Sequence, residues 1–115
     1  MERFSICGRF WVKKDGKNYI GEGRIHLLRE IAATGSISKA AQEMGMSYKA
    51  AWDDVDLMNS MSPSPLVVRT AGGKQGGGTM LTPAGYAILS YYDKLQDAFD
   101  EFVSKALSID IIDDI

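Results

Sequence analysis

Two short helical stretches separated by a glycine, within residues 34–52 (TGSISKAAQEMGMSYKAAW), constrain the fold of this chain most. A serine just before a helix accepts a hydrogen bond from a free backbone N–H, so it marks a helix start. Ser36 or Ser38 is placed to cap the first helix, and Gly45 follows its end. Ser47 is placed to cap the second helix. The pattern therefore predicts helices at 39–44 and at 48 to about 59, joined by a tight turn.

Such a pair of helices is typical of a helix-turn-helix, in which the start of the second helix enters a DNA major groove. The first side chains of that helix would then reach base edges, and here they are Ser47, Tyr48 and Lys49. Ser36 and Ser38 lie where exposed backbone amides of the first helix could bind phosphate. The same pattern also fits two helices that are packed together only for stability.

A glycine-rich loop between two short strands follows the helix pair. We expect strands at 66–69 and 80–81 around the loop 71–79, AGGKQGGGT. A winged helix carries its wing here, at 66–82, and basic wing residues contact the DNA backbone or minor groove. The candidates are Arg69, Lys74 and Gln75. A hairpin tip without any specific contact remains the alternative, and the spacing does not match a nucleotide-binding phosphate loop.

The N-terminal segment 4–21 alternates apolar and polar residues, which predicts a β-hairpin. Asp15 and Gly16 form a two-residue turn signal, and this turn would place Val12 opposite Tyr19. A helix at 23–33 follows. Because a lone hairpin is only marginally stable, it must pack against the rest of the domain or against a partner.

A long helix is predicted at 83–107, since Thr82 can cap it and Pro83 suits its first position. Apolar residues then recur at alternating spacings of four and three, a heptad-like seam that predicts a dimer interface. Its proposed contacts are Ile88, Tyr92, Leu95, Phe99 and Phe102. Residues 108–115 form an acidic tail.

Composition narrows the function without deciding it. The formal net charge is −2, which argues mildly against a nucleic-acid ligand, but residues 93–115 hold seven acids and two bases. Acidity is therefore concentrated at the C-terminal end, and a basic face elsewhere stays possible. The chain has one cysteine and no long apolar run, so we expect a cytoplasmic protein that does not enter a membrane.

Catalytic and metal sites have little support. His26 is the only histidine, and it has no partners at metal-ligand spacing, so we expect no metal, no cofactor and no enzymatic activity. Asp53, Asp54 and Asp56 lie on a predicted helix and fit a solvated face better than a calcium loop. Trp52 could lie in the core or flank the groove, and we favour the core.

The motifs quoted above occur in one order from residue 4 to about 100, together with GEGRIHLLREI and PLVVRTAGGKQGGGTMLTPAG. In this the chain resembles the DNA-binding half of the ModE molybdate-responsive regulators, which share a helix-turn-helix with LysR-type regulators. The resemblance implies a winged-helix fold, a homodimer and promoter binding in molybdenum-related gene control. It maps the helix-turn-helix contacts onto Ser36, Ser38, Ser47, Tyr48 and Lys49, and the wing contacts onto Arg69, Lys74 and Gln75.

The sequence departs from the typical full-length regulator because no molybdate-binding module follows before Ile115. The resemblance therefore implies a stand-alone version of the DNA-binding half, with any effector bound by a separate chain.

We thus expect a mainly α protein with small β elements, a winged helix-turn-helix occupying 1–107. Within it we place the hairpin at 4–21, the helix-turn-helix at 36–60, the wing at 66–82 and the long dimerisation helix at 83–107. The expected ligand is double-stranded DNA with a palindromic operator. The alternative is a winged-helix adaptor that binds proteins and no DNA, supported by the net acidity.

Overall fold

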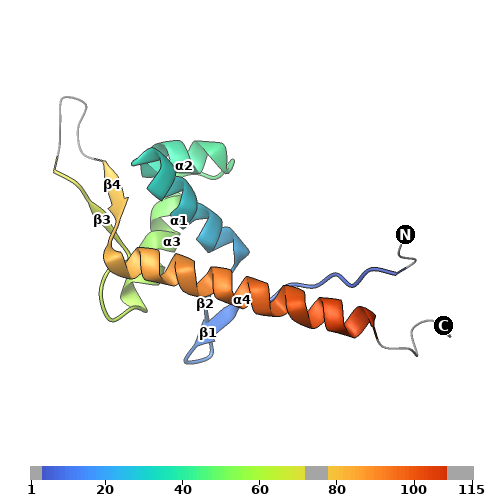
Figure 1. Ribbon diagram of the computed structural model, residues 1–115. Helices are drawn as coiled ribbons and strands as arrows, with labels where there is room; N and C mark the ends of the chain where they lie inside the picture. The colour runs from blue at the N-terminus through green and yellow to red at the C-terminus, as the bar shows by residue number, and fades with distance from the viewer. Residues whose placement is uncertain (1–3, 72–77, 109–115) are drawn as a thin grey trace.

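The computed structural model describes residues 4–71 and 78–108. Over these residues it has four helices and two antiparallel hairpins (Figure 1). The elements in chain order are β1 (Val12–Lys14), β2 (Lys17–Ile20), α1 (Glu22–Thr34), α2 (Ile37–Glu43), α3 (Tyr48–Ser60), β3 (Val67–Arg69), β4 (Thr79–Leu81) and α4 (Pro83–Leu107). This order confirms the predicted fold class, with the long helix last. None of the helices in the described ranges combines the length and the apolar character needed to cross a membrane.

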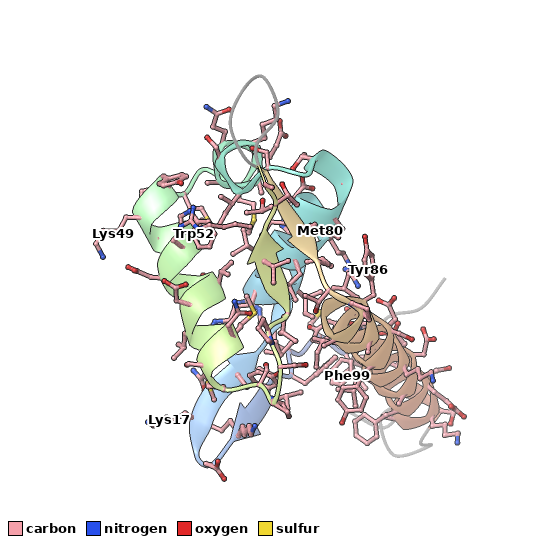
Figure 2. The ribbon with its side chains drawn as sticks, turned by 90° about the vertical axis from the view of Figure 1, so that its left-hand side faces the viewer. Lys17, Lys49, Trp52, Met80, Tyr86 and Phe99 are labelled. Atoms are coloured by element: carbon pink, nitrogen blue, oxygen red, sulfur yellow. The ribbon has the colours of Figure 1, made fainter. Side chains whose placement is uncertain are left out.

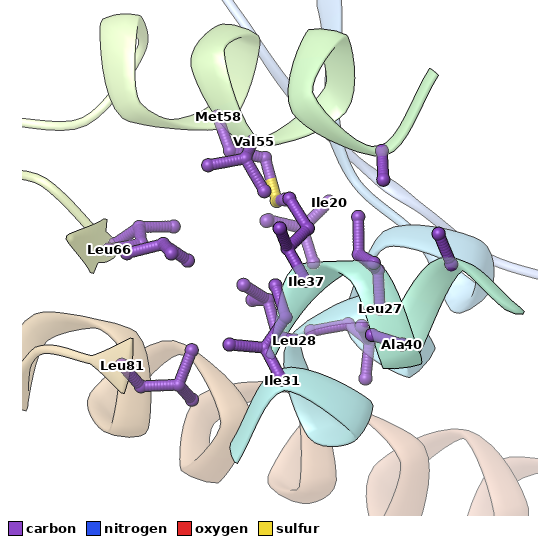
Figure 3. Packing of buried hydrophobic residues seen from close by; sticks show 14 of the residues in the cluster. Ile20, Leu27, Leu28, Ile31, Ile37, Ala40, Val55, Met58, Leu66 and Leu81 are labelled. Atoms are coloured by element: carbon purple, nitrogen blue, oxygen red, sulfur yellow. The ribbon is translucent and has the colours of Figure 1, made fainter. Parts of the chain in front are cut away.

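The core lies where α1 is enclosed by α2, α3, β4 and the first half of α4 (Figure 3). Ile25, Leu28 and Ile31 form one apolar stripe along α1 and are buried. Leu27, which lies outside that stripe, is also buried. The reason is that α1 packs against α2 as well as against β4 and α4, so more than one of its faces is covered. Each such side chain contributes roughly 1.5–3 kcal/mol by leaving water.

Local signals determine where the helices begin and end. The Ser36 hydroxyl caps α2 by accepting a hydrogen bond from the Lys39 N–H, and the Ser47 hydroxyl caps α3 in the same way from Ala50. Gly45, in the turn between the two helices, has a φ of +65°, a left-handed conformation that favours glycine. These contacts confirm the predicted helix pair and show that the first helix begins at Ile37, earlier than expected, because Ser36 is its cap.

The N-terminal hairpin is shorter than predicted. Its turn is as expected, since Asp15 and Gly16 both have positive φ, at 51° and 77°. Only β1 and β2 pair, however, and residues 4–11 belong to no strand. The predicted register is also wrong, because an irregularity next to Val12 places it opposite Ile20 instead of Tyr19.

Residues 4–11 run beside α4 instead of extending the hairpin (Figure 1). Phe10 anchors this arm, because its ring lies 5.1 Å from the Tyr92 ring and 5.4 Å from the Phe99 ring. The period-two pattern of the arm therefore arises from packing on a helix, and such a pattern alone does not distinguish this packing from strand pairing.

The start of α4 is attached directly to Leu66, the residue just before β3. The Thr82 hydroxyl caps α4, and the Thr82 N–H donates to the Leu66 carbonyl at 3.0 Å. A Cβ atom on Gly85 would lie 2.4 Å from that same carbonyl oxygen, so only glycine permits this approach. This attachment fixes the base of the β3–β4 hairpin relative to the helix core.

Candidate nucleic-acid interface

The first turn of α3 is presented to solvent. Ser47 caps it, and Tyr48 leaves 54% of its surface exposed. The Lys49 side chain is 84% exposed and points away from the domain (Figure 2). The opposite face of α3, with Ala51 and Val55, is fully buried in the core, where α3 packs against α2. The helix is therefore held by its apolar face while its first polar side chains stay available to a ligand.

Lys49 forms an ion pair within its own helix. Its Nζ atom lies 2.8 Å from Oδ2 of Asp53, one turn further along. The hydrogen bond to Asp53, followed by the attraction of the carboxylate charge, raises the pKa of Lys49 above its ordinary value. Lys49 is thus cationic at neutral pH. Because an exposed ion pair of this kind contributes little, the side chain can leave Asp53 for an anionic partner.

The start of α2 lies beside α3. The Ser36 hydroxyl is engaged in its capping bond, and Ser38 is exposed in the first turn. Ser36, Ser38, Tyr48 and Arg69 line one hollow of about 90 Å³ between α2, α3 and the β3–β4 hairpin. Four of the residues predicted from sequence therefore meet in one place, although they come from three separate elements.

The β3–β4 hairpin contacts α3 through a cation and an aromatic ring. The guanidinium carbon of Arg69, at the end of β3, lies 3.8 Å from the ring centroid of Trp52. The Tyr48 ring also contacts the Trp52 ring, edge-on, with 6.4 Å between the ring centroids. Lys74 and Gln75, the remaining predicted wing residues, lie outside the described residues.

Residues 23–86, from α1 into the first turn of α4, match the family described as bacterial regulatory helix-turn-helix protein, lysR family. The chain belongs to this family. The match takes in α2, α3 and the β3–β4 hairpin, so every element that lines the hollow lies within the LysR-type region.

Several curated proteins are similar to this LysR-type chain. It is 52% identical over 91 residues to the molybdenum transport protein ModE of Azotobacter vinelandii, a match that covers 79% of this chain and 34% of the relative. It is 45% identical over 93 residues to the DNA-binding transcriptional dual regulator ModE of Escherichia coli K12, covering 77% and 36%. It is 42% identical over 107 residues to the molybdenum-pterin-binding protein MopB of Rhodobacter capsulatus, covering 90% and 40%. The matched region spans about a third to two-fifths of these relatives.

The fold also resembles solved structures at low sequence identity. Streptococcus pneumoniae FabT in complex with DNA superposes with a TM-score of 0.56 at 14% identity, covering 86% of this chain and 69% of that one. The OxyR C206S mutant of Corynebacterium glutamicum gives a TM-score of 0.51 at 18% identity, covering 76% and 27%. These similarities support the winged-helix fold of this LysR-type chain.

Two residues of α3 have roles that their sequence context does not indicate. The sequence leaves Trp52 between the core and the groove and favours the core; in the structure it is half-buried, packs against the core and carries Arg69 on its ring. For Asn59, the sequence predicts only that the second helix ends near it. Its side-chain oxygen accepts from the N–H groups of Leu66 and Val67, at 2.8 and 3.2 Å, and its amide donates to the Val67 carbonyl at 3.0 Å. The spacing of seven between Trp52 and Asn59 was a signal that both lie on one face.

The predicted α4 seam divides into two parts. Ile88, Tyr92 and Phe99 contact this chain's own core or its N-terminal arm. Burial, and then the negative charge of Glu22, raise the pKa of the Tyr92 hydroxyl. Leu95 is half-buried, whereas Phe102 leaves 64% of its surface exposed.

Within the described residues, His26, Cys7 and the acidic residues of α3 do not form a metal site. His26 lies 3.5 Å from a Glu30 carboxylate on the outer face of α1, and Cys7 is exposed on the arm. Over residues 4–71 and 78–108, no group of three or more His, Cys, Asp or Glu side chains is arranged to hold a metal ion. Asp54 is engaged with Arg24 at 3.7 Å.

Proposed function

We propose that this chain binds double-stranded DNA in a sequence-specific manner as a transcription regulator. The observation that supports this most is the convergence of Ser36, Ser38, Tyr48 and Arg69 on one hollow beside the exposed start of α3. A solely structural helix pair would not require polar side chains from three elements to gather at the end of α3 that faces solvent.

In the proposed complex, the start of α3 enters the major groove. Tyr48 and Lys49 are then the side chains that reach base edges, and lysine suits the O6 and N7 acceptors of guanine. Ser36 and Ser38 contact the phosphate backbone beside the groove, where such contacts set the register of the protein. The β3–β4 hairpin is the wing, and Arg69 contacts the adjoining backbone.

Sequence alone supports three further contacts in this proposal. Ser47 lies at the very start of α3 and combines its capping bond with access to the groove. Lys74 and Gln75 belong to the glycine-rich segment of the wing, which would lie along the DNA backbone. The names of the relatives associate them with molybdenum transport, molybdenum pterins and transcription, and we therefore propose a role in molybdenum-related gene control.

A homodimer is part of this proposal. Phe102 and Tyr91 are exposed on α4, at 64% and 53%, with Leu95 half-buried between them. The spacings of four and seven place all three on one side of the helix, as in a helix-pair interface. A twofold dimer would read a palindromic operator with half-sites one helical turn apart or a multiple of it.

Fluorescence anisotropy tests the proposal. The purified protein is titrated into a labelled duplex carrying an operator of a ModE relative, with a random duplex of equal length as the control, at two salt concentrations. We expect tighter binding to the operator. Lys49→Ala should weaken operator binding by roughly 5- to 100-fold, the range expected for one base contact.

The matched control is Lys17→Ala, since Lys17 lies at the hairpin turn, well away from Lys49 (Figure 2). It should change affinity by about twofold or less, because a distant surface charge has only a weak screened effect. Absence of binding to either duplex at low salt would refute the proposal and favour the protein-binding adaptor.

A further inference from the structure

The Trp52 ring and the Arg69 guanidinium form the direct side-chain link between α3 and the wing at the DNA-facing end of the domain. Their separation of 3.8 Å, from guanidinium carbon to ring centroid, is a cation–π contact. Arg69 is exposed, so without this contact its long side chain would sample many rotamers. The ring therefore limits the positions that the guanidinium occupies.

Trp52 itself is fixed in place. It packs against the buried cluster of the core, and the Tyr48 ring meets it edge-on at an interplanar angle of 73°. Its Nε1 atom is buried and has no hydrogen-bond partner among the described residues. A hydrogen bond therefore does not account for a tryptophan at this position, whereas its broad ring face does.

The edge of the Arg69 guanidinium is left free by this stacking. Over the described ranges, no carboxylate lies within ion-pair distance of Arg69, in contrast to Lys49, which is engaged by Asp53. A guanidinium that stacks through its face still offers its N–H groups along the edge, and these match two phosphate oxygens. The hollow that Arg69 borders also receives the Ser36 and Ser38 side chains.

A second side chain of α3, that of Asn59, attaches the wing to this helix. Asn59 holds Leu66 and Val67, at the start of β3, by three hydrogen bonds. Two turns earlier on α3, Trp52 holds Arg69 at the end of β3. The strand is thus attached to the helix at both of its ends.

We propose that Trp52 is a positioning residue for DNA binding, holding the Arg69 guanidinium at the rim of the hollow so that it binds one backbone phosphate seated there. This inference rests on the proposed DNA binding and adds a specific phosphate and a coupling between two side chains. Arg69 touches the phosphate, and Trp52 acts through Arg69.

A double-mutant cycle on operator binding tests the coupling. Arg69→Gln should weaken binding about 10-fold and lower the slope of log affinity against log salt by about one. Trp52→Leu, which removes the ring face, should weaken it about 5-fold or more. The double variant should be no more than about twofold weaker than Arg69→Gln alone, because the two side chains act as one unit. Trp52→Phe, which keeps a ring, should recover most of the affinity.

A duplex with single methylphosphonate substitutions locates the phosphate. One substitution per half-site should weaken binding by wild type and leave Arg69→Gln and Trp52→Leu unaffected. Unfolding curves show whether each variant is folded. If Trp52→Leu is unfolded, the cycle is measured with Trp52→Phe, which removes a buried unpartnered N–H and keeps most of the packing. In that cycle the partial loss should vanish in the Arg69→Gln background.

Independent, multiplicative losses in folded variants, with the salt slope unchanged by the Trp52 substitution, would overturn the inference and leave DNA binding intact. Failure of the wild-type protein to bind DNA at all would instead overturn the proposed function, so the two failures are distinguishable.

Discussion

The Asn59 side chain gives the most direct prediction about how the wing is held. Asn59→Ala removes three hydrogen bonds, two from the backbone N–H groups of Leu66 and Val67 and one to the Val67 carbonyl. Leu66 and Val67 leave only 1% and 3% of their surfaces exposed, so water cannot easily replace the lost partner. At about 1 kcal/mol for each bond, and more where a buried donor is left unpaired, the loss should be about 2–4 kcal/mol.

Urea unfolding followed by circular dichroism measures this change. With a slope of about 2 kcal/mol per molar urea, the middle of the range for a small protein, the midpoint should fall by about 1–2 M while the slope stays constant. Asn18→Ala is the matched control, because Asn18 is exposed on β2 and its side chain makes no hydrogen bond within the described residues. The control should lie within about 0.5 kcal/mol of wild type. An equally small effect of Asn59→Ala would refute the assignment of this side chain as the attachment of β3.

Three further substitutions test separate parts of the account. Gly85→Ala would place a Cβ atom 2.4 Å from the Leu66 carbonyl oxygen, so urea unfolding should show a loss of about 1–3 kcal/mol. Asp53→Asn removes the carboxylate charge that helps to raise the pKa of Lys49, leaves only a weaker amide acceptor for its hydrogen bond, and also removes a charge that repels phosphate. We expect DNA affinity measured by anisotropy to rise about two- to fivefold at low salt. Phe102→Asp should convert the proposed dimer to a monomer in light scattering, because this exposed ring lies on the proposed interface.

Each of these has a control and a contradicting outcome. Gly23→Ala is the control for Gly85, since a Cβ atom there meets nothing within 4 Å, and equal stability of both alanine variants would contradict the close approach. Asp97→Asn, on α4, removes the same charge far from α3, so an equal gain in affinity would show that only net charge matters. An unchanged mass for Phe102→Asp would exclude that face of α4 as the interface.

Helix starts and the fold class could be predicted because they depend on local chemistry. Ser36, Ser47 and Thr82 cap their helices, and serine and threonine are common at this position. Gly35 ends α1 in the left-handed conformation, which glycine adopts easily. The helix pair followed by a strand, a glycine-rich loop and a second strand then allowed few folds other than a winged helix.

Long-range contacts could not be predicted in the same way. The spacing of Phe10 and its neighbours fits a strand and equally fits an arm packed on α4, and only the tertiary structure decides between them. A heptad pattern predicts Phe99 as a helix-pair contact without showing whether its partner belongs to another chain or to the same one, and the structure places the Phe10 ring of the same chain beside it. Trp52 looked apolar enough for the core, and nothing nearby in sequence indicates that Arg69 lies over its ring.

Selection from a random DNA pool tests the central claim most directly. Duplexes with a fully randomised central region are incubated with the purified protein, the bound fraction is recovered and sequenced, and the procedure is repeated with Lys49→Ala. The account predicts that wild type enriches an inverted repeat, and that Lys49→Ala loses the preference at one base pair in each half-site while retaining weaker binding. A bound fraction with the same sequence distribution as the starting pool would contradict the claim that α3 reads DNA sequence.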